Sequence, residues 1–446
     1  MRAVVLAAGK GTRMKSAIPK VFHELCGRSM LWWGLQTLRD AGIEEIVVVA
    51  NPEMEAGLAP LKAPGSRIVV QREQLGTGHA LRIALEAIEP RKGGRILVAN
   101  GDMPLVTAEI FRAALDALGD GAMALVTLRA GTDSNFGRIV RDGDRIVRIV
   151  EVRDASPAQL AIEETNAGIY AVDEMKARDA VAALRNANAQ GEYYLTDAVE
   201  HLASAGERIS PVVCRDERSL IGINDRSELA RARSWMNERL CTGHMRDGVT
   251  IVDPQTTYLE PELKIGRDTV VYPNTTIARL SRIGEGCTIG PNARLSNAKI
   301  GNRTVIRESV VLDSAIGDDA HVGPFAHLRG ETVLANEVRI GNFVELKNAQ
   351  LGTAAKASHL SYIGDATVGE ETNVGAGTIT CNFDGKRKNR TKIGKRALIG
   401  SNSSLVAPIE IGDDALTGAG SVVTKDVPAG GRVAGNPARP LPSKPS

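Results

Sequence analysis

The chain has 446 residues, of which 43% are hydrophobic and 24% charged, with a formal net charge of +2. This length predicts two or three domains, and the composition is typical of a soluble globular protein. The near-neutral charge excludes a strongly basic nucleic-acid-binding protein. Five scattered cysteines without a C-x-x-C pair predict free thiols rather than disulfides or a zinc site. No signal peptide precedes the first strand and no apolar run could span a bilayer, so we expect a cytoplasmic protein with no membrane partner.

Residues 1–222 alternate short aliphatic runs with helical patterns, which predicts one domain. Strands are expected at 3–6, 46–50, 68–70, 96–99 and 124–128, and helices at 30–41, 78–88, 108–118 and 174–184. A β-hairpin is expected around Asp142, Gly143 and Asp144. This order predicts an α/β domain with a Rossmann-like mixed, mostly parallel sheet, whose ligands bind at the carboxyl ends of the strands.

The first such end is the loop LAAGKGTRM at residues 6–14. Its spacing fits neither G-x-x-x-x-G-K-[ST] nor G-x-G-x-x-G, so from glycines alone a plain strand-to-helix turn is as well favoured as a phosphate-binding loop. Small residues do let backbone N–H groups approach phosphate oxygens, and Lys10, Arg13 and Lys20 add positive charge.

Three segments together resemble the sugar-1-phosphate nucleotidylyltransferases: the loop at 6–14 with Lys20, QREQLGTGHA at 71–80, and NGDMPL at 100–105. The resemblance implies that Asp102 binds Mg²⁺ and that Arg13 acts in uridylyl transfer. It also implies contacts to UTP and the product from Leu6, Ala7, Ala8, Gly9, Lys20, Gln71, Gly76, Thr77, Gly137, Glu151, Asn166 and Asn224.

Several of these residues also have simple structural explanations. Asp102 could cap the helix that begins near residue 108. Asn224 matches the second metal ligand of the family, but Asn224 or Asp225 could instead cap the next helix, with Glu228 completing a capping box on Asp225. Where the family often has tyrosine, this chain has Asn100, so the contact that the tyrosine makes is not carried over to this position.

Residues 223–246 are expected to form a linker helix, because Leu229, Met236 and Leu240 recur at helical spacing. Beyond it, from 247 to 446, an aliphatic residue returns about every sixth position. A period of six is typical of hexapeptide repeats, which form a parallel β-helix. The inward-pointing residues would be Ile265, Val271, Ile277, Ile283, Ile289, Leu295, Ile300, Ile306, Leu312, Ile316, Val322, Leu328, Leu334, Ile340, Leu346, Ile393, Ile399, Leu405 and Ile411.

The repeat is interrupted by TCNFDGKRKNRTK at 380–392. Insertions in solenoids form loops, often on the binding face. This insertion is strongly basic, so it is either a site for an anionic ligand or an ordinary solvated loop.

The runs PFAHLR (324–329), NFVELK (342–347), HLSYIGD (359–365) and NVGAGTITCN (373–382) resemble a bacterial bifunctional family. Its members join a glucosamine-1-phosphate acetyltransferase to an N-acetylglucosamine-1-phosphate uridylyltransferase, and the similarity extends from residue 6 to about 423. The resemblance implies a left-handed β-helix, a homotrimer, and synthesis of UDP-N-acetylglucosamine from glucosamine 1-phosphate, acetyl-CoA and UTP. A single-activity nucleotidylyltransferase with a purely structural or regulatory β-helix is the alternative.

Within this resemblance, His359 is the general base of acetyl transfer, for which a pKa near neutrality is suited. Glucosamine phosphate and acetyl-CoA would be bound by Arg329, Lys347, Tyr362, Asn373, Ala376, Asn382, Phe383, Ser401 and Ala419. Phe383 stands where the family commonly has tyrosine. The C-terminal cationic contact to coenzyme A could be Arg432 or Arg439.

Overall fold

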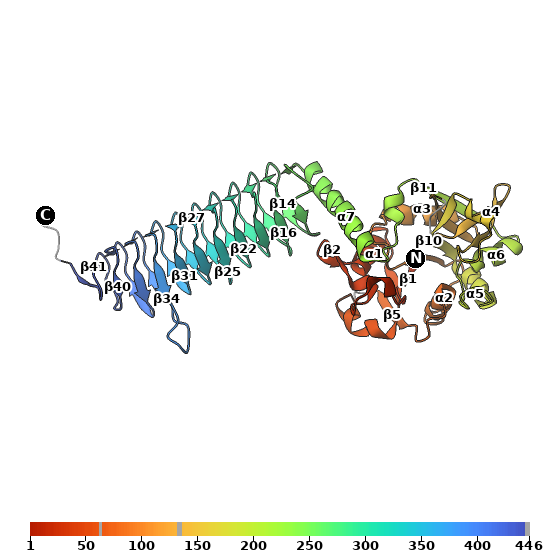
Figure 1. Ribbon diagram of the computed structural model, residues 1–446, viewed down its shortest axis with the longest axis horizontal. Helices are drawn as coiled ribbons and strands as arrows, with labels where there is room; N and C mark the ends of the chain where they lie inside the picture. The colour runs from red at the N-terminus through yellow and green to blue at the C-terminus, as the bar shows by residue number, and fades with distance from the viewer. Residues whose placement is uncertain (62–64, 132–135, 442–446) are drawn as a thin grey trace. The chain divides into compact units, whose positions relative to one another are not determined.

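The structure is a computed structural model that describes residues 1–61, 65–131 and 136–441. The last five residues of the predicted second domain, 442–446, lie outside the described residues. The chain divides into two compact units, Met1–Trp235 and Met236–Ser446, which run from red to green and from green to blue in Figure 1. No helix in the described ranges combines the length and the hydrophobicity needed to cross a bilayer.

The first unit is built on one mixed sheet with the strand order β11-β7-β10-β6-β1-β4-β5. Every strand predicted from the sequence is present within two residues of its expected ends. They are β1 (Arg2–Leu6), β4 (Glu45–Ala50), β5 (Ser66–Val70), β6 (Arg95–Asn100), β7 (Met123–Arg129), β8 (Arg138–Asp142) and β9 (Arg145–Val150). Strands β1, β4, β5 and β6 run parallel, as expected.

Two strands of this sheet were not predicted, β10 (Glu164–Asp173) and β11 (Ile209–Cys214). Strand β10 lies between β6 and β7 and is antiparallel to both. Its pairing with β7 shifts register between Asn166 and Tyr170, and Gly168 in that interval has φ +73°. Such a bulge breaks the period-two pattern by which a strand is recognised in a sequence.

Helices cover both faces of this sheet. Helices α1 (Met30–Asp40) and α3 (Ala108–Leu118) pack on one face through Leu31, Leu35 and Phe111. On the other face lie α2 (Thr77–Glu86), α5 (Glu174–Ala183) and α6 (Asp197–Ser204). Because both faces are buried, the central strands are almost wholly apolar.

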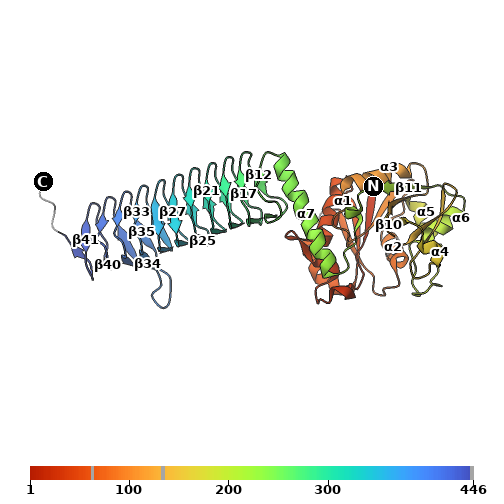
Figure 2. The ribbon, with the colours of Figure 1, turned by 45° about the horizontal axis from the view of Figure 1, so that its top comes forward.

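The second unit is a left-handed parallel β-helix made of three sheets of short strands, which Figures 1 and 2 show as a stack of coils. Neighbouring coils place like residues in register, as in Ile265 opposite Ile283 and Ile283 opposite Ile300. All but one of the predicted inward aliphatics belong to its buried core. The exception is Leu312: Val311 is fully buried and Leu312 is only partly so. The prediction for Leu312 was wrong because this corner is one residue short, and a one-residue shift turns a strand's side chains to the opposite face.

Both ends of the β-helix are covered. Helix α7 (Arg226–Arg246) lies within the linker helix predicted for residues 223–246, and its Leu240 and Cys241 pack against the apolar core. Asn237 donates to the carbonyl of Thr257 at 2.7 Å and accepts from the backbone of Leu259 at 3.1 Å. At the other end, β41 (Arg432–Ala434) pairs with β42 (Arg439–Pro440) in the antiparallel sense.

Candidate active sites in the two units

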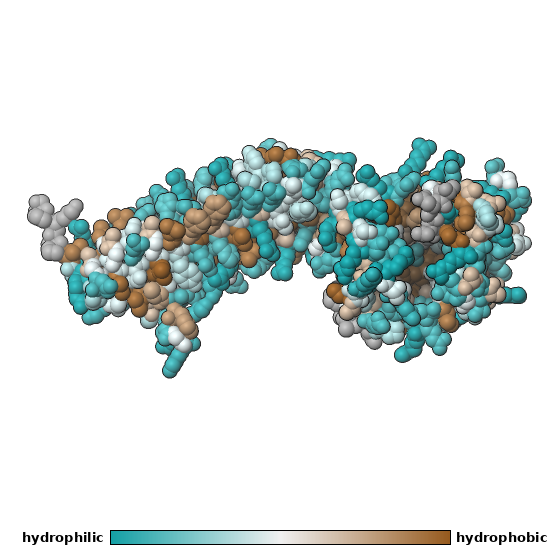
Figure 3. Space-filling view, in the orientation of Figure 1, coloured by the Kyte–Doolittle hydropathy of each residue, from teal (hydrophilic) through white to brown (hydrophobic). Residues whose placement is uncertain are grey.

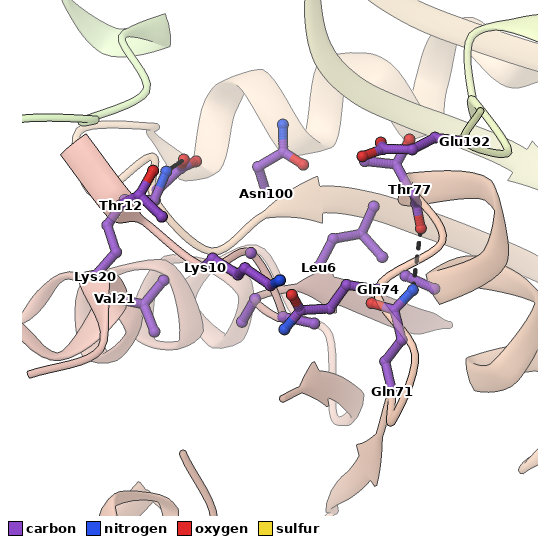
Figure 4. Close-up of a pocket in the computed structure, with 16 residues that line it drawn as sticks. Leu6, Lys10, Thr12, Lys20, Val21, Gln71, Gln74, Thr77, Asn100 and Glu192 are labelled. Carbon is purple, nitrogen blue, oxygen red and sulfur yellow. Dashed lines mark hydrogen bonds and ion pairs between the residues drawn. The ribbon is translucent and has the colours of Figure 1, made fainter. Parts of the chain in front are cut away.

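A cavity of about 560 Å³ opens at the carboxyl ends of β1 and β6, where doubly covered parallel sheets bind ligands. Figure 3 shows this unit hollowed on the face turned to the viewer. Figure 4 shows Lys10, Gln74 and Thr77 around the opening. Its lining includes nine residues predicted to bind the nucleotide or metal, namely Leu6, Ala7, Ala8, Gly9, Lys20, Gln71, Gly76, Thr77 and Asp102.

The loop after β1 is tied to its neighbours by backbone hydrogen bonds. The N–H of Ala7 donates to Val49 at 2.9 Å, and the carbonyl of Leu6 accepts from Gly101 at 2.9 Å. A Cβ added to Gly9 would meet nothing within 4 Å, so the loop is open to a ligand there. At Gly11, with φ +59°, an added Cβ would lie 2.6 Å from the Cβ of Lys20. Glycine at this position therefore lets Lys20 cross the loop closely.

The Lys20 ammonium is shared by the two predicted metal ligands. It pairs with Asp102 Oδ2 and donates to Asn224 Oδ1 at 3.2 Å. Asp102 does not cap α3, whose N-cap residue is Thr107. One carboxylate oxygen and one amide oxygen thus converge on a single ammonium group. The described residues contain no cluster of three or more His, Cys, Asp or Glu side chains that could hold a metal without further ligands.

The cap of α7 is Asp225, so the side chain of Asn224 is left to contact Lys20. Asp225 Oδ1 accepts from the N–H groups of Ser227 and Glu228 at 2.8 Å. Glu228 reaches back to the N–H of Asn224 rather than to that of Asp225. The expected capping box is therefore shifted by one residue.

Gln71 is held in one orientation at the cavity wall. Its Nε2 donates to the carbonyl of Gly76 at 3.1 Å and lies 3.0 Å from His79 Nδ1. Burial and the nearby Arg82 lower the pKa of His79, which keeps the ring neutral and able to accept this proton. The Oε1 atom of Gln71 is then the acceptor left for a ligand.

A second group of predicted residues meets beside the cavity. Asn166 donates its backbone N–H to Gly137 at 2.9 Å, and an added Cβ on Gly137 would lie 3.6 Å from the Glu151 carboxyl carbon. Burial raises the pKa of Glu151, although a hydrogen bond from Thr196 at 3.0 Å opposes this. Asn100 lines the cavity and faces Gly168 in the bulge of β10.

The structure adds Glu192 to the predicted site and leaves five predicted residues outside the cavity lining, namely Arg13, Gly137, Glu151, Asn166 and Asn224. Glu192 lines the cavity because Tyr193 exchanges backbone hydrogen bonds with Leu75 and Gly78 at 2.8 Å. No local sequence signal marks this contact, which joins segments far apart in the chain. Arg13, the predicted catalytic residue, lies in the 3-10 turn Thr12–Met14 with an exposed side chain and is not in the cavity lining.

In the β-helix, His359 ends the strand β30 (Lys356–His359), directly opposite Asn342 at the end of β27 (Arg339–Asn342). His359 Nδ1 lies 2.7 Å from Asn342 Oδ1. The amide oxygen can only accept, so Nδ1 carries the proton and Nε2 is left as a base.

Ala376, Ser401 and Ala419 follow the ends of three successive strands in the same sheet, β33 (Asn373–Val374), β36 (Leu398–Ile399) and β39 (Leu416–Thr417). The row continues from His359, whose carbonyl accepts from Gly377 at 3.4 Å. Nearer the C-terminus, Arg432 is partly buried and its Nε lacks a hydrogen-bond partner, whereas Arg439 is exposed.

Three cationic side chains gather on the adjoining sheet. Arg329 and Lys347 are neighbours in register on β25 (His327–Arg329) and β28 (Glu345–Lys347). Glu345 accepts from Arg329 Nε at 3.0 Å. Lys388, which was not singled out from the sequence, comes from the basic insertion, and its contact and like charge lower the pKa of Lys347. The adjacent lysines Lys347 and Lys388, beside the Arg329–Glu345 pair, favour an anionic ligand.

Tyr362 and Asn382 meet beside this cluster, with Asn382 Nδ2 3.5 Å from the Tyr362 hydroxyl. Phe383 is 61% exposed and forms a bridge with Lys388. Asn373 lies in a different sheet from Tyr362. It is exposed on strand β33, next to the strand β30 that ends in His359.

Comparisons with known proteins agree with this division. The chain matches a MobA-like NTP transferase domain over residues 3–239, a GMPPB C-terminal domain over 254–350, and a hexapeptide repeat of succinyl-transferase over 390–425. It is similar to the bifunctional protein GlmU of Geobacillus sp. (strain WCH70), at 48% identity over 96% of this chain and 93% of the relative.

Two further relatives carry the same name. The protein of Heliobacterium modesticaldum is 47% identical over 96% of this chain and 94% of its own length, and that of Streptomyces avermitilis is 44% identical over 96% and 90%. With such identity along nearly its whole length, and with a nucleotidyltransferase unit joined to a hexapeptide-repeat unit, the chain belongs to the GlmU family of bifunctional proteins.

Proposed function

We propose that the chain makes UDP-N-acetylglucosamine in two steps at two separate sites. The β-helix transfers the acetyl group of acetyl-CoA to the amino group of glucosamine 1-phosphate. The first unit then transfers UMP from UTP to N-acetylglucosamine 1-phosphate and releases pyrophosphate. The observation that carries this proposal is the presence of a candidate site in each unit, one around Asp102 and one around His359.

In the uridylyl site, Asp102 and Asn224 would hold Mg²⁺. Their oxygens already converge on the Lys20 ammonium, so the position suits a cation, and Mg²⁺ prefers such hard oxygen ligands together with substrate phosphates. When bound, the metal neutralises charge on the phosphoryl oxygens. The chain contributes the open backbone at Gly9 for the phosphates and the Gln71 Oε1 acceptor for an N–H of the base.

In the acetyl site, His359 Nε2 takes a proton from the 2-amino group as its nitrogen attacks the thioester carbonyl. The C–S bond then breaks, and coenzyme A leaves as the thiol with that proton. Asn342 holds the tautomer that leaves Nε2 basic. Arg329, Lys347 and Lys388 would bind the sugar phosphate, because their charges converge on one face. The row Ala376, Ser401 and Ala419 offers small side chains along which coenzyme A would lie.

We also propose that three chains pack their β-helices side by side in the cytoplasm, where both cosubstrates are made. Phe325 and Phe343 stack at 5.4 Å on one corner while remaining 52% and 56% exposed, and Leu360 follows at 62%. Apolar groups are visible on the β-helix surface in Figure 3, and exposed apolar patches often mark protein–protein contacts. A neighbouring chain would cover them and could bring Asn373 of one chain to Tyr362 of another.

A coupled assay tests the function. Purified protein with glucosamine 1-phosphate, acetyl-CoA, UTP and Mg²⁺ should release both thiol and pyrophosphate. Each activity of a variant is assayed on its own substrate. With glucosamine 1-phosphate and acetyl-CoA, His359→Ala should abolish thiol release, and with N-acetylglucosamine 1-phosphate and UTP it should keep pyrophosphate release. His321→Ala, an exposed histidine on the same sheet, should change neither. Asp102→Ala should abolish pyrophosphate release when N-acetylglucosamine 1-phosphate is supplied. Thiol release without pyrophosphate from the unaltered chain would refute the two-reaction proposal, and loss of both activities in one folded variant would refute separate sites.

A further inference from the structure

The basic insertion is a defined hairpin rather than a free loop. Figures 1 and 2 show it projecting from the β-helix beside β34 (Ile379–Cys381). We call residues 382–390 the basic hairpin. The N–H of Asn389 donates to the carbonyl of Asn382 at 2.7 Å, and Asp384 accepts from the backbone of Lys386 and Arg387 at its tip. These hydrogen bonds hold the pKa of Asp384 at about 2.

At the base of the basic hairpin lies Asp365, which is 8% exposed. Its Oδ2 accepts from Asn382 Nδ2 at 2.5 Å, and its Oδ1 accepts from Asn348 Nδ2 at 2.7 Å. Its backbone carbonyl accepts from Thr391 at 3.2 Å, and its N–H donates to the carbonyl of Lys347 at 2.9 Å. One residue therefore touches the start of the hairpin, its exit and the strand that carries Lys347.

The charge of Asp365 makes this position unexpected. A buried carboxylate costs free energy unless it is well hydrogen-bonded, and this one lies close enough to Lys347 to raise that lysine's pKa against the effect of Lys388. Electrostatics alone would make a carboxylate here weaken the binding of a phosphate. Any favourable contribution of Asp365 to phosphate binding then comes from the geometry that it imposes on Asn382 and the basic hairpin.

We propose that Asp365 is a positioning residue for acetyl transfer. It anchors both ends of the basic hairpin, so that Lys388 is held beside Lys347 and Asn382 beside Tyr362 before the sugar phosphate binds. The proposal rests on the acetyl-transfer function proposed above. It adds a residue that touches neither substrate and acts through the hairpin.

The sign of one kinetic change distinguishes positioning from charge. Asp365→Asn keeps the size of the side chain, and asparagine tolerates the φ of +49° at this residue. Its single amide oxygen can accept from only one of Asn382 and Asn348, so the two-sided anchor is broken. If the hairpin needs its anchor, the KM for glucosamine 1-phosphate rises about tenfold or more, with the KM for acetyl-CoA and uridylyl transfer unchanged. If Asp365 acts only through its charge, that KM falls, and the proposal is overturned.

Two controls and one activity-independent measurement complete the test. Asn348→Ala removes the hydrogen bond that does not reach the hairpin, and Glu370→Gln neutralises an exposed carboxylate paired with Lys395; both should leave the KM within about twofold. Amide hydrogen exchange at Asn389 and Thr391 should accelerate in Asp365→Asn. Unchanged exchange would overturn the proposal. Absence of acetyl transfer in the unaltered protein would refute the proposed function instead. Amide hydrogen exchange would still decide whether Asp365 anchors the hairpin.

Discussion

Replacing Lys20 by methionine should open the proposed metal position of the first unit in the absence of nucleotide. In the structure the Lys20 ammonium occupies the point where the oxygens of Asp102 and Asn224 converge. A metal ion that enters the free protein must displace this ammonium. In Lys20→Met, a side chain of similar length without charge leaves both oxygens to the metal.

The magnitude follows from the burial of the pair. The side chains of Lys20 and Asp102 are 13% and 19% exposed. Unit charges in contact near a protein surface attract by about 4 kcal/mol at an effective dielectric constant near 20. Desolvation and lost side-chain freedom offset much of this, which leaves about 1–3 kcal/mol for a charged hydrogen bond. The Kd of the nucleotide-free protein for Mn²⁺, a probe for the Mg²⁺ position, should then fall roughly 10- to 100-fold.

The measurement is a Mn²⁺ titration followed by electron paramagnetic resonance, without UTP or sugar phosphate. Lys10→Met is the matched control, because Lys10 lines the same cavity and its replacement removes the same charge. If Lys20→Met binds Mn²⁺ no more tightly than Lys10→Met, the ammonium does not occupy the metal position, and the argument that Asp102 and Asn224 form a cation site fails with it.

Three further outcomes are expected. Gly11→Ala should reduce uridylyl transfer at least about tenfold and leave acetyl transfer unchanged, since the added Cβ would lie 2.6 Å from Lys20; equal loss of both activities would contradict this. Burial, and next Glu200, raise the pKa of Asp197 to about 6, so its stabilising contribution is present below its unfolded pKa near 4 and is lost as the pH rises through about 6. Asp197→Asn should therefore raise the unfolding free energy in urea by about 1 kcal/mol at pH 8, after allowance for its partial exposure, and by less at pH 4; an equal gain at both values would refute the pKa argument. Leu346→Ala, at a fully buried position of the β-helix, should lower its unfolding free energy by about 2–5 kcal/mol in guanidinium, and a loss below about 1 kcal/mol would show that neighbouring coils collapse into the space.

The sequence predicted the parts of the fold that repeat or alternate. Hexads from Ile265 onward predicted the β-helix because each inward residue is set by local spacing, and the family resemblance, the two-part fold and the bifunctional class are all confirmed. The error at Leu312 has the same origin, since a corner that lacks one residue changes the count without changing the composition. Strand β10 escaped prediction because Gly168 and the register shift hide its alternation.

The candidate sites were predictable where a motif carries them and not where a tertiary contact does. Sequence alone left Asn224 between capping and metal binding, and only the hydrogen bonds of Asp225 assign the cap. Lys388 could be recognised as one of several basic residues, but its position beside Lys347 depends on how the hairpin folds back. Glu192 lines the cavity of the first unit because of backbone contacts between distant segments, which no sequence pattern predicts.

The covered ends of the β-helix prevent chains from associating end to end. Every coil pairs with the next in parallel register, so an uncovered last coil would present free N–H and C=O groups to any identical chain and could template open-ended fibre growth. Helix α7 blocks one end, and the reversal from β41 to β42 blocks the other. The number of coils between these two ends can then change without exposing an unpaired strand edge. Duplication or loss of a whole coil can therefore lengthen or shorten the β-helix.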